Sequence, residues 1–130
     1  MRDKRRVGVS LDGDVFEELE RVAKAFNTDR SHIVNMAARE YLLEKFHYAK
    51  PHSCEGVMII SYDPARGQEV AEAIEESKSL VVSRSHFHTG DGCCLEILYL
   101  KGDSEEIWLL EKRVSHLCDV CRFVPSHRLQ

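Results

Sequence analysis

Long hydrophobic runs are missing from this 130-residue sequence. No stretch approaches the roughly 20 apolar residues that a membrane-spanning helix needs. The basic start, Met1–Arg6, is followed by alternating apolar residues and not by the continuous apolar run of a signal peptide. We therefore expect a cytoplasmic protein that has no membrane as a partner.

An even set of cysteines is also missing, because the chain has five. In a reducing compartment such cysteines are free, metal-bound or redox-active more often than they form structural disulfides. The chain also has seven histidines, and most of them share one region with four of the cysteines. This composition favours a metal site.

A broad basic surface is absent, since the formal net charge is −4. Residues 1–50 nevertheless carry 10 basic and 9 acidic side chains, whereas residues 51–130 carry 8 and 13. Four of the first six residues are basic. This distribution indicates a localised contact with an anion at the N-terminus.

The first 50 residues predict one strand followed by two helices. Residues 6–11 alternate strictly between polar and apolar side chains, as a strand does. Asp14–Glu17 resembles a capping box that opens the first helix, and Asp29 is the expected N-cap of the second. Because so short a segment cannot bury enough surface by itself, we predict an obligate homodimer whose two strands pair in an antiparallel ribbon.

Residues 51–130 predict a second domain. The pattern gives strands at 57–62, 80–88, 93–101 and 119–125, and helices at 64–77 and 104–117. The order β-α-β-β-α-β is that of a ferredoxin-like fold. The predicted fold class is therefore α+β, with a ribbon-helix-helix module at residues 1–50 and a ferredoxin-like (ACT-like) domain at residues 51–130.

The predicted ribbon indicates a protein that binds double-stranded DNA. A two-stranded antiparallel ribbon fits the major groove. Every second residue would face the bases, and these are Arg6, Gly8 and Ser10. Backbone phosphates would be contacted by Arg2, Lys4, Arg5 and the amides near Ser31, which open the second helix.

A candidate metal site lies in the second domain. His86 and His88 are two residues apart on a predicted strand and so share one face, and Cys94 follows on the partner strand after the turn 89–92. Two imidazoles and a thiolate can hold nickel, copper, cobalt or zinc. The same residues could instead be two exposed histidines and one small buried cysteine.

The segment 86–103 resembles the metal-binding core of NikR-type nickel-responsive regulators. It has His-x-His, five further residues, Cys-Leu-Glu, and then a strand that ends in Lys-Gly. The strand 6–11, Arg30–Ser31 and Ser61–Tyr62 match the family in the same order. The resemblance implies a homotetramer with four central ferredoxin-like domains, nickel bound between subunits, and metal-favoured operator binding that represses nickel uptake.

One family ligand differs in this chain. His86, His88 and Cys94 match three of the four ligands that the resemblance implies, but the fourth, a histidine in the family, is Glu75 here. Three alternatives follow: Glu75 coordinates the metal; Glu76, Cys93 or water replaces it; or the position is vacant. The DNA-facing residues also differ from the family's Arg, Thr and Thr, which implies a different operator.

Other functions remain to be weighed. Cys118 and Cys121 form a CxxC pair, and Cys93 and Cys94 are adjacent, so a metal-independent DNA-binding thiol sensor that uses either pair is the main alternative. A metal-storage or delivery protein that has lost DNA recognition is another. An enzyme is disfavoured, since the sequence contains no evident nucleophile-base pair or phosphate-binding loop.

Overall fold

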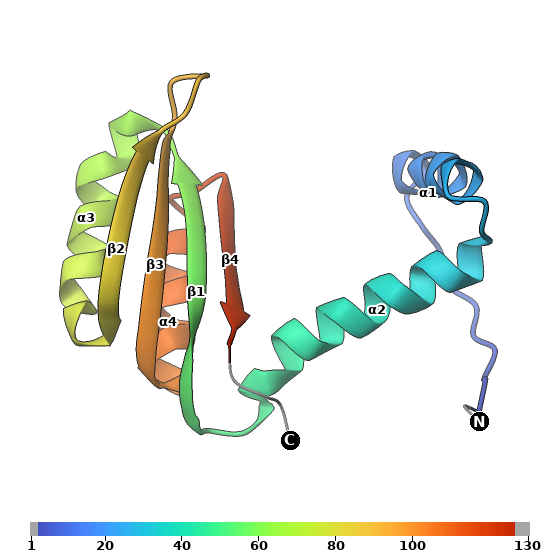
Figure 1. The fold of residues 1–130 in the computed structure, drawn as a ribbon, viewed down its shortest axis with the longest axis horizontal. Helices are drawn as coiled ribbons and strands as arrows, with labels where there is room; N and C mark the ends of the chain where they lie inside the picture. Colours follow the sequence, from blue (N-terminus) through green and yellow to red (C-terminus); the bar gives the residue numbers. More distant parts are fainter. Residues whose placement is uncertain (1–2, 127–130) are drawn as a thin grey trace. The chain divides into compact units, whose positions relative to one another are not determined.

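The computed structural model describes residues 3–126, apart from the side chains of Phe46 and His47. Two helices open the chain, α1 (Gly13–Ala25) and α2 (Arg30–Phe46) (Figure 1). The chain divides into two compact units, Met1–Tyr41 and Leu42–Gln130, and this division falls within α2. In the described part of the chain, no helix is long and apolar enough to span a membrane.

The turn between α1 and α2 is built by local hydrogen bonds. Asn27 has a positive φ of 51°, and the amide of Thr28 donates to the carbonyl of Ala23 at 2.9 Å, which is the pattern of a Schellman motif. Asp29 then caps α2, because its Oδ1 accepts the amide of His32 at 2.8 Å. The predicted N-cap at Asp29 is confirmed.

The predicted capping box at Asp14–Glu17 is wrong. Helix α1 already begins at Gly13, with Asp12 as its N-cap in an extended conformation. The carbonyl of Asp12 accepts the amide of Phe16 at 2.9 Å, so the first helical hydrogen bond forms two residues earlier than a helix capped by Asp14 would allow. The side chain of Asp12 makes no capping hydrogen bond.

Residues 3–12 form no strand within the single chain described. A strand needs a neighbouring strand to accept and donate its backbone hydrogen bonds, and no described segment pairs with these residues. Their side chains are all exposed. The predicted ribbon therefore stays a prediction, because its partner strand would come from a second chain.

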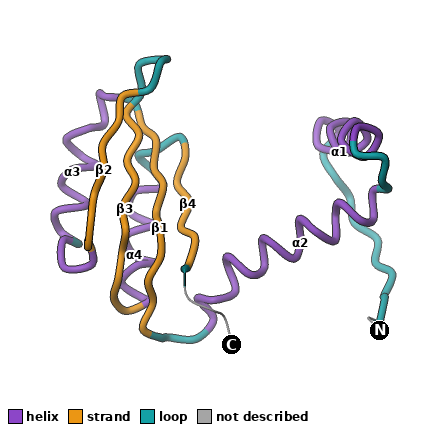
Figure 2. The backbone as a smooth tube through the Cα atoms, in the orientation of Figure 1, coloured by secondary structure: helices purple, strands orange, loops and turns teal. Residues whose placement is uncertain are grey.

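The second unit is a four-stranded antiparallel sheet with two helices (Figure 2). Its strands are β1 (Ser53–Tyr62), β2 (Val81–His88), β3 (Cys94–Asp103) and β4 (Val120–Pro125), in the spatial order β2-β3-β1-β4. Helices α3 (Gly67–Glu76) and α4 (Ser104–Ser115) cover one face (Figure 1). Short 3₁₀ helices lie at His47–Ala49, Pro64–Arg66 and Lys78–Leu80. The predicted β-α-β-β-α-β order is confirmed.

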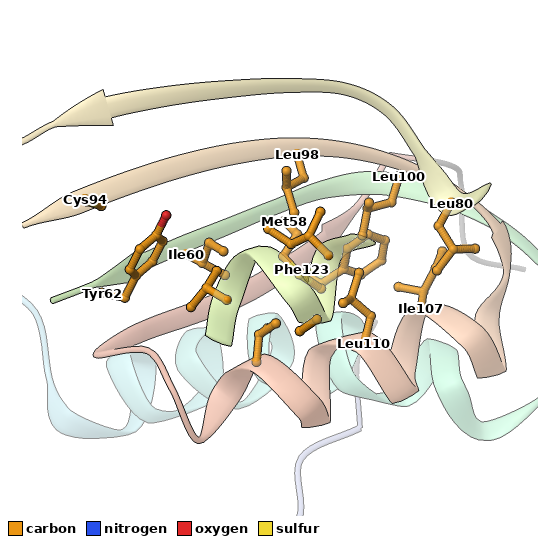
Figure 3. Close-up of a cluster of buried hydrophobic side chains, with 14 of the residues drawn as sticks. Met58, Ile60, Tyr62, Leu80, Cys94, Leu98, Leu100, Ile107, Leu110 and Phe123 are labelled. Atoms are coloured by element: carbon orange, nitrogen blue, oxygen red, sulfur yellow. The ribbon is translucent and has the colours of Figure 1, made fainter. Parts of the chain in front are cut away.

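The core lies between the sheet and its two helices (Figure 3). Strands β1 and β3 alternate, so that every second side chain points toward the helices. The most deeply buried apolar side chains are Met58, Ile60, Val70, Leu98, Leu100, Ile107, Leu110, Val114 and Phe123. Helical spacing in the sequence predicts a set of inward residues: Val70, Ala73, Ile74, Ile107, Leu110, Val114 and Leu117. The structure buries all of them except Leu117, which lies beyond the end of α4 and is half-buried.

Candidate metal centre

The β2–β3 hairpin is closed by a short, well-bonded turn. The amide of Thr89 donates to the carbonyl of Cys93 at 2.8 Å, and the amide of Cys93 donates to Oγ1 of Thr89 at 3.0 Å. Gly92 has a φ of +88°, which a side chain would disfavour. This turn sets the register of the hairpin, in which His88 lies opposite Cys94 and His86 lies opposite Glu96.

The hairpin brings the three predicted ligands together. One ligand atom from each of His86, His88 and Cys94 lies within 4.8 Å of the other two. The two imidazole rings are 5.1 Å apart between centroids and inclined at 63°. Both histidines are exposed whereas Cys94 is buried. Because metal–sulfur and metal–nitrogen bonds are about 2.0–2.3 Å long, a small closure would let these atoms bind one transition-metal ion.

A buried carboxylate stands behind the three ligands. Glu96 is completely buried on β3, beside His86, and its Oε1 lies 3.7 Å from Nδ1 of that histidine. At this distance the carboxylate faces Nδ1, so Nε2 is the ring nitrogen of His86 that a metal could use. Glu96 was not predicted as a site residue from the sequence, although its place two residues after Cys94 on one strand puts both side chains on the same face.

Two further side chains hold Glu96 in place. The hydroxyl of Tyr62 donates to Oε2 of Glu96 at 2.5 Å, and Nε of Arg84 forms an ion pair with Oε1. Burial, together with the hydrogen bond to Glu96, raises the pKa of Tyr62. Its phenol therefore stays a hydrogen-bond donor at neutral pH. Tyr62 lies beside Cys94 at one end of the core (Figure 3).

Glu75 does not join the three ligands of its own chain. Its side chain is 73% exposed and forms an ion pair with Lys78 at 3.5 Å. Glu76, the neighbouring alternative, pairs with Arg113 at 2.7 Å. Cys93 lies on the turn and is half-buried, but the group of three does not include it either. Among the described residues of one chain, the group therefore offers three ligand atoms.

The CxxC pair does not have the features of a reactive thiol. Cys118 follows α4 and Cys121 lies on β4, and both are half-buried and free. Burial raises the pKa of Cys118 to about 11 and that of Cys121 to about 12. The reactive form is the thiolate, and its fraction is very small at neutral pH. This finding argues against a thiol sensor that uses the Cys118–Cys121 pair.

The predicted DNA contacts lie in one exposed segment. Lys4, Arg5, Arg6, Gly8 and Ser10 are all exposed, and Arg5 pairs with Asp3 at 3.1 Å. Ser31 lies exposed in the first turn of α2. Arg2 lies outside the described residues. The segment offers several cations to solvent, and its DNA contacts stay a prediction.

The chain is similar to known regulators over most of its length. Residues 55–123 match the model of the NikR C-terminal nickel-binding domain. A relative from Chlorobaculum tepidum is 30% identical over 124 residues, which is 92% of each chain. A second, from Saccharolobus islandicus, is 26% identical over 114 residues, covering 86% of this chain and 84% of its own. Both relatives carry the name nickel-responsive regulator.

One solved structure supports the fold. The uncharacterized protein TM1266 from Thermotoga maritima aligns over 58% of this chain and 100% of its own, with a TM-score of 0.54 and 15% sequence identity. At this identity the likeness concerns the fold alone. It agrees with the α+β assignment.

Proposed function

The chain belongs to the NikR family of nickel-responsive regulators, and we propose that it is a metal-responsive transcription regulator that binds nickel and represses genes of metal uptake or homeostasis. The convergence of His86, His88 and Cys94 at one hairpin end carries this proposal. In it, residues 1–50 form the DNA-binding domain and residues 51–130 the metal-binding and tetramerisation domain. A regulator of this family is not an enzyme.

Nickel is the metal that the family model and the named relatives support. Its ligands in this chain would be one ring nitrogen of each histidine and the thiolate of Cys94, a donor set that also suits cobalt, copper or zinc. Nickel(II) would supply a divalent positive charge, which His86 and His88 of β2 and Cys94 of β3 would hold between the two hairpin strands. Glu96 would orient His86 and offset part of that charge.

The fourth coordination position would be filled from outside this group of three. The ion pair of Glu75 with Lys78 and its exposure support a solvated carboxylate in the single chain. Water or a residue of a second copy would then complete the site. Glu75→His would add a histidine at the position where the family has its fourth ligand, so we expect it to tighten nickel binding, whereas Glu75→Gln would leave it unchanged.

A second copy of the chain would complete the N-terminal unit. Val7, Val9 and Phe26 are 82%, 67% and 75% exposed, and pairing with a second chain would give such apolar side chains a surface on which to be buried. In the proposed homodimer, residues 6–11 of two chains pair as a ribbon and present Arg6, Gly8 and Ser10 to the major groove. Arg2, Lys4, Arg5 and the amides near Ser31 would contact phosphates of the operator.

The sheet of the C-terminal unit offers a surface for tetramer formation. Helices α3 and α4 cover one face only (Figure 1). The other face exposes the apolar side chains of Phe87, Ile97 and Val124, which are 49%, 38% and 40% exposed. Packing this face against another copy would bury these side chains and support the proposed homotetramer.

Nickel titration followed by absorbance tests the proposed site. We expect a sulfur-to-nickel charge-transfer band in the wild type, its loss in Cys94→Ala, and its retention in Cys118→Ala, a matched control at a cysteine outside the site. The absence of a band in the wild type, or a band that survives Cys94→Ala, would refute the site. Binding to DNA from its own promoter, measured with and without nickel at several salt concentrations, tests the regulator function.

A further inference from the structure

A buried carboxylate lies outside the proposed metal site and takes no part in the proposed metal binding. Glu111 lies on α4 and is 8% exposed. Tyr48 donates its hydroxyl hydrogen to Oε2 at 3.0 Å, and Nζ of Lys45 lies 3.4 Å from Oε1. Burying a charged carboxylate is costly unless it is paired and hydrogen-bonded. Both partners come from the last turn of α2 and the short helix that follows it.

Further contacts hold the same segment on the C-terminal unit. Nε of Arg122 on β4 contacts both carboxylate oxygens of Glu44, at 2.8 and 3.0 Å. The ring of Tyr48 packs 6.4 Å from the ring of Phe123, which belongs to the core. The chain from Glu44 to Tyr48 is therefore attached to α4 and β4 at several points.

A third attachment follows before β1 begins. The amide of His52 donates to Oγ of Ser104 at 3.0 Å, and the amide of Ser104 donates to the carbonyl of His52 at 2.9 Å. Ser104 is the first residue of α4 and is buried. The segment 44–52 thus belongs structurally to the C-terminal unit, which begins at Leu42.

We propose that Glu111 is a positioning residue that fastens the end of α2 to the metal-binding unit and so transmits the metal-bound state to the DNA-binding helix. Helix α2 is continuous from Arg30 to Phe46. One end carries Ser31, a proposed phosphate contact, and the other carries Lys45. When the end of a continuous helix that carries Lys45 is held in place, a displacement of that end also moves the other end of the helix, which carries Ser31. This inference rests on the proposed function.

The order of the chain explains why the carboxylate suits this role. Glu111 lies midway along α4, one turn after Ile107 and one turn before Val114, which both point into the core that supports the sheet. A shift of α4 caused by closure of the β2–β3 hairpin would therefore move Glu111, and with it Tyr48 and Lys45. The part-buried ion pair to Lys45 and the hydrogen bond from Tyr48 limit how far these groups can move independently of Glu111.

Hydrogen–deuterium exchange of the full-length protein, with and without nickel, tests the fastening and the transmission together. In the wild type we expect nickel to slow amide exchange in the hairpin and along α2. In Glu111→Gln, which keeps the volume but removes the charge, we expect nickel affinity within about 2-fold of the wild type. Exchange in the last turn of α2 should be about 10-fold faster, which corresponds to the loss of one charge-assisted contact, and the nickel effect on α2 should disappear.

A matched control and a second variant keep the test decisive. Glu106→Gln removes the same charge from an exposed position on the same helix α4, and we expect the wild-type response. If Glu111→Gln does not fold, Tyr48→Phe removes one hydrogen bond of the same group and should reduce the nickel effect on α2. Amide exchange in α2 at the wild-type rate in Glu111→Gln or Tyr48→Phe would overturn the proposal. Faster exchange in α2 would also overturn it if nickel still slowed that exchange as much as in the wild type.

The operator measurement separates this proposal from the proposed function. We expect the ratio of operator affinities with and without nickel to fall about 10-fold in Glu111→Gln, because allosteric coupling typically changes an affinity by about 5- to 150-fold. A wild type whose operator affinity ignores nickel would refute the function. In that case the exchange experiment alone would still decide whether nickel reaches α2 through Glu111.

Discussion

The two units of this protein differ in how much of their structure one chain can complete. In the described part of the N-terminal unit, Ala23 is the one apolar side chain that is buried, and Val7 and Phe26 remain largely exposed. The C-terminal unit buries a continuous core from both helices and strands β1, β3 and β4. We therefore expect the first unit to require a second copy, whereas the second already has the packing of a folded domain.

The geometry of the proposed metal site is set by the C-terminal unit, which one chain folds by itself. A four-stranded sheet with a bonded turn sets the register that places His86, His88 and Cys94 together. No comparable framework holds residues 3–12, for which a partner strand is predicted from a second chain. One chain can thus bring the three candidate metal ligands together, while the predicted DNA-binding ribbon would require two.

The largest effect should separate two phenylalanines. Phe123 is 1% exposed in the C-terminal core, and Phe26 is 75% exposed beyond α1. We expect Phe123→Ala to lower the free energy of unfolding by about 3–5 kcal/mol, because it leaves a cavity. Phe26→Ala should lower the free energy of unfolding of the C-terminal unit by less than about 0.5 kcal/mol. Denaturant unfolding followed by far-UV circular dichroism measures both, and equal losses would contradict the comparison.

A charge on the predicted ribbon should affect the N-terminal unit alone. We expect Val9→Lys to weaken operator binding about 100-fold. Val9 would lie on the face of the ribbon that points away from the bases, and burying a lysine there is costly. The substitution should also reduce the dimer fraction in light scattering. Gln68→Lys, which adds the same charge on exposed α3, is the control. Undiminished operator binding by Val9→Lys would show that residues 6–11 do not form the interface.

Removing the hydroxyl of Tyr62 should weaken the metal site from behind. Tyr62→Phe deletes the hydrogen bond to buried Glu96, and loss of such a supporting contact reduces metal affinity about 10-fold or more. Tyr99→Phe is matched, because the hydroxyl of Tyr99 donates to Glu55 at 2.5 Å on a different part of the sheet. Competition titration with a nickel chelator measures both affinities. The same affinity in the two variants would show that Glu96 does not support the site.

Cysteine reactivity tests the comparison without changing metal or operator binding. Because the pKa of Cys118 is raised to about 11, alkylation at pH 8 should be about 100-fold slower than for an ordinary thiol of pKa about 9. An introduced cysteine at exposed position 10, Ser10→Cys, should react at the ordinary rate. Mass spectrometry after timed alkylation gives both rates, and a plateau near pH 9 for Cys118 would contradict the raised pKa.

The raised pKa of Cys118 also makes the stability of the fold depend on pH in the alkaline range. The folded state holds the thiol proton of Cys118 more tightly than the unfolded state does, so this group favours the folded state fully below pH 9. Its contribution is lost as the pH rises from about 9 to about 11. Stability in this alkaline window should therefore fall more steeply in the wild type than in Cys118→Ala.

Periodicity in the sequence was sufficient to predict most of the elements. The inward faces of α3 and α4, the order of the strands and the N-cap at Asp29 follow from local patterns, because side-chain spacing and capping are properties of neighbouring residues. The predicted start of α1 at Asp14 was wrong, because Asp12 and Asp14 are both suitable N-cap residues and local patterns do not distinguish them. The pairing of His86, His88 and Cys94 was predictable because a short hairpin makes it nearly local.

The sequence by itself determined the α+β class, the helices, the strands and the set of three candidate ligands, because these depend on residues a few positions apart. Only the tertiary structure decided that Glu96 stands behind His86, that Glu75 pairs with Lys78, and that Glu111 receives Tyr48 and Lys45. The contacts of Glu96 and Glu111 depend on the register of whole strands and on helices packed across the sheet. Burial also decided the protonation of Cys118 and Cys121, since the surrounding core disfavours a thiolate.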